Sequence, residues 1–384
     1  MFERIDRAIA GAVAAKRVPG VVAMVQSADG KALYETAQGV RSLATGAPMT
    51  LDTVCMIFSM TKAITSVCAL QQIEAGKIGF DDPLDDLLPP LADRPVLEGF
   101  DGSGQPILRP KKGPITLRRL LTHTSGFVYD TWNENAKRYM DVAKVPSLRL
   151  RQKAGLLMPL ARDPGEKWEY SIGIDWVGQA VEALTGQTLG AYMAERVFQP
   201  LGMTSTIYDP TPELEARKAQ VHARQPDGSL KPIEMPKAEK PEFEGGGGGL
   251  HSTVVDYMRF SQCILNGGAP LLQPKTMPLV RENQMGDLRV TQLPTHNPQL
   301  SNPAEFFPGL PKVWSAAFML NLEQAPTGRS AGSMAWAGLG NCYHWIDPTK
   351  RVCGTILTQV LPFCDAEVLG LLDLLERDTY AAIG

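Results

Sequence analysis

Ser59 and Lys62 are the two residues of this chain whose types and spacing most directly suggest chemistry. They stand three positions apart at the start of a helical pattern, which places a hydroxyl and an amine on one face, about one turn apart. A serine hydroxyl becomes a strong nucleophile when a neighbouring base takes its proton, and a buried lysine with a lowered pKa can do so. The pair predicts covalent catalysis on Ser59. Taken alone, it leaves open a capped helix with a solvated lysine.

The helix that must position this pair is expected over residues 63–75, ending at Gly76. Its apolar residues recur at helical spacing, at Ile64, Val67, Leu70 and Ile73. Ser59 then lies in the first turn. Free backbone N–H groups and the positive end of the helix dipole favour developing negative charge there.

Strand-like segments occur near both ends of the chain. Residues 21–26 and 31–37 flank a turn, and three alternating segments lie near the C-terminus, at 333–338, 341–346 and 352–359. A helix over residues 368–380 follows them. This order predicts an α/β (α+β) fold, in which helices flank an antiparallel sheet built from both ends of the chain.

The middle of the chain is predicted to be an inserted domain, because residues 116–202 are mostly helical in pattern. The expected division is a discontinuous α/β domain of residues 1–85 plus 205–384 and a mostly helical inserted domain of residues 86–204. Within the first domain, Val254–Leu265 is expected to be a helix. Residues 283–311 have little periodicity and are expected to form a long loop that shapes the cleft or contacts a partner.

Composition excludes several classes of partner. The 384 residues are 44% hydrophobic and 21% charged, which is typical of a globular enzyme in solution. A formal net charge of -3 gives no electrostatic reason to expect nucleic acid or an anionic membrane. No stretch approaches the roughly 18 apolar residues that span a bilayer. The opening segment lacks the apolar centre of a secretory signal.

The cysteines and histidines suggest neither disulfides nor a metal site. The six cysteines are scattered and contain no Cys-x-x-Cys pair, so reduced buried thiols and a cytoplasmic location are expected. The five histidines have no metal-ligand spacing. No metal or organic cofactor is therefore implied.

Four separated segments together resemble the serine β-lactamase and penicillin-binding-protein superfamily. They are Ser59-Met-Thr-Lys62, Leu121-Thr-His-Thr-Ser-Gly126, Pro164-Gly-Glu-Lys-Trp-Glu-Tyr-Ser171 and Pro200-Leu-Gly-Met203. Gly246-Gly-Gly-Gly-Leu250 and Trp336-Ala-Gly338 extend the match in the same order over nearly the whole chain. Within the superfamily the chain is similar to the class C β-lactamase-like family VIII carboxylesterases. The resemblance implies a β-lactamase/transpeptidase-like fold.

The resemblance also implies roles for individual residues. Ser59 is then the acylated nucleophile, Lys62 its partner, and Tyr170 shares the proton transfer. Neighbouring cationic or hydrogen-bonding groups can lower the pKa of a tyrosine, which makes its phenolate a plausible base. Whether Lys62 or Tyr170 takes the proton first stays open. The backbone N–H groups of Ser59 and Leu339 are expected to hold the oxyanion.

Two departures from the lactamase pattern bear on the substrate. Ile172 stands where β-lactamases usually carry an asparagine, and Trp336-Ala-Gly338 stands where they carry Lys-Thr-Gly. Without that lysine the site lacks a cation suited to a carboxylate, and the indole makes this side apolar. The implied substrates are uncharged esters of short acyl chains. The predicted substrate-binding residues are Trp336, Gly338, Phe127, Tyr129 and Ile172, with Trp132 as a further candidate.

Three other motifs are interpreted as structural. Gly328-Arg-Ser-Ala-Gly332 has the Gly-x-Ser-x-Gly pattern, but a strand-like run follows Ser330 where a nucleophile elbow needs a helix. His123 is expected to be buried and hydrogen-bonded. The five glycines 245–249 lack the Lys-Ser/Thr that closes a phosphate loop, and they are expected to form a tight backbone crossing near the cleft.

The predicted function is a cytoplasmic serine carboxylesterase that forms an acyl-enzyme on Ser59, with weak β-lactam hydrolysis as a side activity. Its partner is a small-molecule ester, with no nucleic acid and no membrane, and the chain is a monomer or homodimer. The alternatives of the same fold are a class C-like β-lactamase, a D-amino-acid peptidase and an acyltransferase. A non-catalytic binding or regulatory protein is the alternative from another class.

Overall fold

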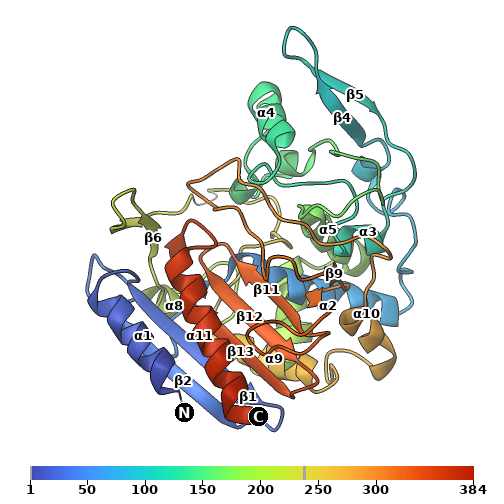
Figure 1. Cartoon of the computed structure of the whole chain (residues 1–384). Helices are drawn as coiled ribbons and strands as arrows, with labels where there is room; N and C mark the ends of the chain where they lie inside the picture. Colours follow the sequence, from blue (N-terminus) through green and yellow to red (C-terminus); the bar gives the residue numbers. More distant parts are fainter. Residues whose placement is uncertain (1, 237–238) are drawn as a thin grey trace.

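A seven-stranded antiparallel sheet built from both ends of the chain lies at the centre of the computed structural model, which describes residues 2–236 and 239–384 (Figure 1). Its strand order is β2-β1-β13-β12-β11-β10-β9. The N-terminal strands are β1 (Gly20–Ser27) and β2 (Ala32–Gly39). The C-terminal strands are β9 (Lys312–Trp314), β10 (Met319–Asn321), β11 (Met334–Gly338), β12 (Cys342–Asp347) and β13 (Val352–Leu357). The predicted fold class is confirmed.

Helices cover both faces of this sheet. The first and last helices, α1 (Glu3–Ala14) and α11 (Ala366–Ile383), lie side by side over one face, near the two chain ends (Figure 1). The Arg4 guanidinium donates a hydrogen bond of 2.7 Å to Asp378 between them. Helix α9 (Val254–Leu265) packs against β1 and β13 on the opposite face. Because neither face meets water, β12 and β13 are buried along their whole length.

The remaining helices lie mostly around one end of the sheet. Helix α2 (Thr61–Glu74) follows a short 3-10 helix over Phe58–Met60 and ends just before Gly76, whose φ of 68° suits a helix terminus. The others are α3 (Leu117–Leu121), α4 (Glu134–Ala143), α5 (Gly173–Thr185), α6 (Leu189–Met193), α7 (Gln199–Leu201), α8 (Pro212–Ala216) and α10 (Met277–Arg281).

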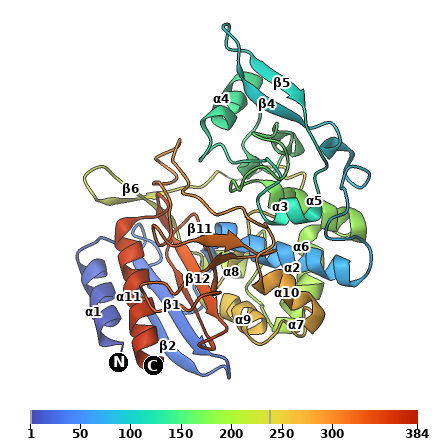
Figure 2. The same cartoon turned by 45° about the vertical axis from the view of Figure 1, so that its right-hand side comes forward.

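The predicted inserted domain, residues 86–204, contains a β-hairpin as well as helices. The hairpin of β4 (Pro95–Phe100) and β5 (Pro106–Pro110) extends away from the central sheet, beside α4 (Figure 2). Prolines at the ends of these strands weaken the strand pattern in the sequence, because proline cannot donate to a ladder. The division of the chain at residues 85 and 204 stays a prediction.

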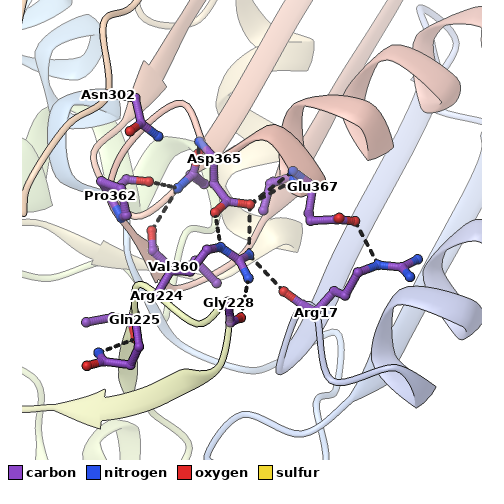
Figure 3. A network of polar contacts seen from close by, with 12 residues as sticks. Arg17, Arg224, Gln225, Gly228, Asn302, Val360, Pro362, Asp365 and Glu367 are labelled. Atoms are coloured by element: carbon purple, nitrogen blue, oxygen red, sulfur yellow. Dashed lines mark hydrogen bonds and ion pairs between the residues drawn. The ribbon is translucent and has the colours of Figure 1, made fainter. Parts of the chain in front are cut away.

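A small three-stranded sheet contacts the start of α11 through hydrogen bonds of Arg224. It contains β6 (Val221–Arg224), β7 (Leu230–Ile233) and β14 (Val360–Leu361), and a separate pair joins β3 (Cys55–Met56) to β8 (His251–Ser252). Figure 3 shows Arg224 contacting Asp365, the residue that caps α11, and donating to the Arg17 carbonyl at 2.8 Å. Arg224 thereby connects the small sheet to the segment after α1 and to the start of α11.

The cysteines behave as expected: all six are buried and unpaired. In the part of the chain that the structure describes, none of the helices has the length and apolar character needed to cross a membrane.

Candidate active site

Ser59 lies in the 3-10 turn that leads into α2, one turn earlier than the α-helix proper. The preceding residue, Phe58, has a φ of 46°, which is a strained backbone conformation for a bulky side chain. Neighbouring segments hold the turn in place. The Ile57 N–H donates to the Leu250 carbonyl at 3.0 Å, and the Tyr257 hydroxyl donates to the Met60 carbonyl at 3.0 Å. Such strain is a feature of sites whose geometry the surroundings impose.

Lys62 is buried, with 2% of its surface exposed. Its Nζ lies 2.6 Å from the Gly247 carbonyl, 2.9 Å from the Tyr129 hydroxyl and 3.3 Å from Ser59 Oγ. Burial lowers the pKa of Lys62 to about 7, and the charge of Asp175 opposes this shift. A neutral amine has two hydrogens and one lone pair. The Gly247 carbonyl and the Tyr129 hydroxyl can accept these two hydrogens. The lone pair is then available to accept the proton of the Ser59 hydroxyl.

Tyr170 meets the same two residues. Its hydroxyl accepts a hydrogen bond of 2.9 Å from Trp336 Nε1 and lies beside Ser59, and Lys62 Nζ lies 4.7 Å from the centre of its ring. The structure thus brings together the three side chains that the sequence selected, from the 3-10 turn, from α2 and from the segment before α5. Their catalytic roles stay predictions.

The expected lowering of the Tyr170 pKa is wrong. Burial raises the pKa of Tyr170, and its hydrogen bonds with Ser59 and Trp336 only partly oppose the rise. Burial removes the water that would stabilise a phenolate at Tyr170. Tyr170 is therefore a hydroxyl at neutral pH, and Lys62 is the group whose protonation changes there.

Aromatic rings surround the Tyr170 side chain. The ring centres lie between 4.7 and 6.3 Å away, and they belong to His123, Tyr129, Trp132, Trp314 and Trp336. The sequence predicted the apolar character of this side from Trp336. It did not predict Trp314, whose strand β9 has only three residues and gives no periodic signal.

The turn after β11 lies directly against the residues before Ser59. A Cβ atom on Gly338 would stand 2.3 Å from the Ile57 carbonyl oxygen, and one on Gly340 would stand 2.8 Å from the Phe58 ring. Only a residue without a side chain fits at either position. Leu339 lies between these two glycines, in the turn that packs against the residues before Ser59. Its part in the oxyanion hole stays a prediction.

Gln359, which the sequence did not single out, links both halves of this arrangement. Its amide pairs with both backbone groups of Met56: Oε1 accepts from the N–H at 3.0 Å and Nε2 donates to the carbonyl at 3.0 Å. The adjacent Thr358 hydroxyl donates to the Gly340 carbonyl at 3.0 Å. The segment after β13 thereby holds the strand that leads to Ser59 and the turn that carries Leu339. A glutamine after a strand carries no sequence signal for such a role.

We expect Gln359→Leu to destabilise the fold by about 1–3 kcal/mol, because it removes both hydrogen bonds of the Gln359 amide to the partly buried N–H and carbonyl of Met56. Ester turnover should fall as well, since the oxyanion donors lose their relative placement. Urea denaturation and p-nitrophenyl butyrate kinetics measure the two effects. Gln225→Leu is the control, because that side chain makes one bond, to the Ala223 carbonyl, far from Ser59. Equal stability of the two variants would contradict the role of Gln359.

A cavity of about 70 Å³ adjoins Tyr170 and is lined by Tyr129, Trp132 and residues 291–294 of the long loop. Hydrogen bonds connect the loop to residues 131–132 on the other side of the cavity. The His296 N–H donates to the Thr131 carbonyl at 2.8 Å, and Trp132 Nε1 donates to Ser301 at 3.1 Å. Part of residues 283–311 therefore lies beside Tyr170, which fits the shaping of the cleft. The other role considered for this loop, contact with a partner, stays a prediction.

The predicted substrate-binding residues separate into two groups. Tyr129 lines the cavity and contacts Lys62, and Trp336 contacts Tyr170. The structure does not bring Phe127 or Ile172 to this cavity. Phe127 is fully buried and stacks on Trp176 at 6.1 Å, and Ile172 is buried at the start of α5. Their part in substrate binding stays a prediction without a supporting contact.

The three motifs interpreted as structural, around Ser330, at His123 and in the glycine run, make contacts that hold the backbone or fill the core. Ser330 lies in a turn before strand β11, and its N–H donates to Asp347 at 2.9 Å. His123 is buried, with Nδ1 3.2 Å from the Ser171 hydroxyl, and burial lowers its pKa well below the usual range. The glycine run is a close crossing. A Cβ on Gly246 would stand 2.3 Å from the Ile174 carbonyl oxygen.

Comparisons with known proteins agree over the whole length. The beta-lactamase family model matches residues 5–375. Monacolin J acid methylbutanoyltransferase of Aspergillus terreus is 31% identical, over 98% of this chain and 95% of the relative. Lovastatin esterase of Penicillium rubens is 28% identical, over 98% of each chain. The structure of simvastatin synthase (LovD) from Aspergillus terreus superposes with a TM-score of 0.87 at 31% identity, over 99% of this chain and 98% of that one. The β-lactamase/transpeptidase-like fold is confirmed.

Proposed function

We propose a function from one premise: the chain belongs to the beta-lactamase family of serine hydrolases. It is an acyltransferase, in which Ser59 takes a short acyl group from an ester and passes it to the hydroxyl of an acceptor. The relatives include a methylbutanoyltransferase and an esterase, and these reactions share an acyl-enzyme. They differ in whether an alcohol or water accepts the acyl group. Family VIII-type carboxylester hydrolysis is therefore the alternative outcome at the same site, rather than the main function.

The acylation step uses Lys62 as the first base. Its neutral amine takes the proton of the Ser59 hydroxyl while Oγ attacks the ester carbonyl carbon, and the carbonyl oxygen becomes an oxyanion facing the Ser59 and Leu339 N–H groups. When the tetrahedral intermediate collapses, the bond to the leaving alkoxide breaks. Tyr170 gives that oxygen its hydroxyl proton and is reprotonated from the Lys62 ammonium. The contact of Lys62 Nζ with Ser59 Oγ at 3.3 Å carries this proposal.

The transfer step runs the same groups in reverse. The acceptor hydroxyl gives up its proton through Tyr170 to Lys62 and its oxygen attacks the acyl carbon. The bond to Ser59 Oγ then breaks, and Oγ recovers the proton. Microscopic reversibility makes one arrangement sufficient for both steps. Water follows the same route when it replaces the acceptor, which gives hydrolysis.

The surroundings support an uncharged acyl group of a few carbons, such as the methylbutanoyl group named for one relative. Aromatic rings line the space around Tyr170, and Trp336 replaces the lysine that would attract a carboxylate. Hydrolysis of β-lactams, which carry such a carboxylate, stays a side activity in this proposal. The long loop lines the cavity with residues 291–294, and hydrogen bonds at His296 and Ser301 hold it there, which favours acyl transfer by restricting water.

Partition of the acyl group between water and alcohol tests the function. With p-nitrophenyl 2-methylbutyrate as donor, we expect added alcohols to raise the rate of p-nitrophenol release, and to yield more new ester than free acid. Chromatography of the products gives the ratio at each alcohol concentration. Acid as the sole product at every concentration would favour the plain carboxylesterase. Faster turnover of nitrocefin or D-alanyl peptides would favour the lactamase or peptidase alternatives.

The unpaired, buried cysteines support a reducing compartment, and we retain a cytoplasmic location as part of this proposal. The substrate is a small-molecule ester, and the chain acts as a monomer or homodimer. Labelling of Ser59 by a fluorophosphonate excludes a non-catalytic binding protein, because the probe reacts with activated serines.

A further inference from the structure

Asp175 is a buried carboxylate that the proposed reaction does not use directly. It lies in the first turn of α5 with 3% of its surface exposed. Its Oδ1 accepts the Gly247 N–H at 2.9 Å, and the Tyr129 hydroxyl lies beside the carboxylate. A Cβ on Gly247 would stand 2.5 Å from Asp175 Oδ2 and 2.8 Å from the Tyr129 oxygen. The three groups thus converge on one point.

Lys62 reaches the same two neighbours from the other side. Its Nζ donates to the Gly247 carbonyl at 2.6 Å and to the Tyr129 oxygen at 2.9 Å. Two bridges, each one residue long, therefore join Asp175 to Lys62. One passes through the backbone of Gly247 and the other through the hydroxyl of Tyr129.

We propose that Asp175 is a positioning residue that acts on Lys62 through Tyr129 and Gly247 and so directs the amine lone pair at Ser59. The inference rests on the proposed function, in which Lys62 is the first base. A carboxylate can only accept, so the Tyr129 hydroxyl donates its hydrogen to Asp175 and presents an oxygen lone pair to Lys62. Gly247, fixed by its N–H, presents its carbonyl. Both hydrogens of the neutral amine are then donated, one to Tyr129 and one to Gly247, and the lone pair faces Ser59 Oγ.

Asp175 is also the carboxyl group whose charge acts on Lys62. Burial raises the pKa of Asp175, and the Lys62 charge and the Gly247 N–H oppose this rise and favour the carboxylate. The other titratable groups that face the amine are Tyr129, Tyr170 and His123. Burial keeps all three uncharged, because it raises the pKa of the tyrosines and lowers that of the histidine. Asp130 and Arg149 shift the pKa of Tyr129 in opposite directions. An opposite charge favours the protonated amine, so Asp175 holds the Lys62 pKa higher than burial alone would leave it.

The test is Asp175→Asn, which keeps the shape but removes the charge. The new amide N–H donates to the Tyr129 oxygen, and the Tyr129 hydroxyl then donates to the lone pair of Lys62 and competes with Ser59. We expect the rate of Ser59 acylation to fall by about 10- to 100-fold. The acid limb of the pH profile is the part at low pH where the rate rises as Lys62 loses its proton. We also expect this acid limb to move to lower pH by about one unit, because loss of the carboxylate lowers the Lys62 pKa. A purely structural role would not move this limb.

Asp256→Asn is the matched control. Asp256 is also 3% exposed, lies in the first turn of α9 and accepts a backbone N–H, that of Ser205, at 2.7 Å. It has no contact with Lys62, so its variant should lose stability while the acid limb stays in place. Tyr129→Phe removes one of the two bridges and no charge. It should slow acylation about tenfold, with a smaller shift of the limb than in Asp175→Asn.

The readout is the pH dependence of fluorophosphonate labelling of Ser59, measured by intact mass, with circular dichroism as the check of folding. An unmoved limb in folded Asp175→Asn, beside normal labelling of the wild-type chain, would overturn the inference and leave the proposed function standing. If Asp175→Asn does not fold, an unchanged acylation rate in Tyr129→Phe overturns it instead. Absence of labelling at Ser59 in the wild-type chain would refute the proposed function itself.

Discussion

Ser59→Ala is expected to lower ester turnover by about 10⁴- to 10⁶-fold. The variant keeps Lys62, Tyr170 and the backbone donors, but no acyl-enzyme can form without Oγ. The remaining rate is what binding and the oxyanion donors give to water attack. Release of p-nitrophenol from p-nitrophenyl butyrate measures turnover, and intact mass after mixing with the ester detects the acyl group, which should be absent from the variant.

Ser330→Ala is the control for this substitution. Ser330 belongs to a Gly-x-Ser-x-Gly run, yet a strand follows it and its backbone, rather than its hydroxyl, makes the contacts with Asp347 and Asn321. His344, which follows it in the chain, contacts the Tyr257 hydroxyl at 3.3 Å. The variant should retain most of the turnover. Activity that survives Ser59→Ala and disappears in Ser330→Ala would transfer the nucleophile to the second motif.

The parts of the fold that could be predicted are those with long periodic segments. Helix α9 was predicted over Val254–Leu265 and has those bounds in the structure. The start of this helix is well marked in the sequence, because Thr253 is a residue type that caps helix N-termini. In the structure the Thr253 hydroxyl accepts the Asp256 N–H at 3.1 Å. Strands β11 to β13 are buried over all of their five or six residues, because helices cover both faces of the sheet.

The parts that could not be predicted owe their structure to distant partners. Strands β9 and β10 have three residues each and are strands only because they pair with one another and with β11. β4 and β5 contain prolines and pair with each other across a short turn. In such segments the local preference is weak and tertiary pairing decides the conformation.

The site divides in the same way. Ser59, Lys62 and Tyr170 carry motif signals, and the structure brings them together. Gln359 acts on Met56 from 303 residues away, and Gly247 holds Lys62 from 185 residues away, both through backbone groups that no local pattern marks. Asp175 had a signal of its own, an acid in the first turn of a predicted helix, but the usual role of such an acid is to stabilise the helix.

Tyr170→Phe is expected to lower turnover by about 10²- to 10⁴-fold while leaving the acid limb of the pH profile near 7. The variant keeps the ring that packs against Trp336 and Lys62, but loses the hydroxyl that passes protons to and from the leaving and accepting oxygens. The limb belongs to Lys62, whose pKa is lowered to about 7 by burial and which must be neutral to act. Turnover therefore rises with pH through 7 and is level above it.

The two candidates for the first base give opposite results in this experiment. If Tyr170 were the base, activity would follow its ionisation. Burial raises the pKa of Tyr170, so the wild-type rate would keep climbing at high pH, and the Phe variant would have no limb at all. Tyr192→Phe is the matched control, since that buried hydroxyl accepts from Gln72 far from Ser59, and its loss should leave the profile unchanged. A residual activity in Tyr170→Phe that still rises through pH 7 would assign the first proton transfer to Lys62.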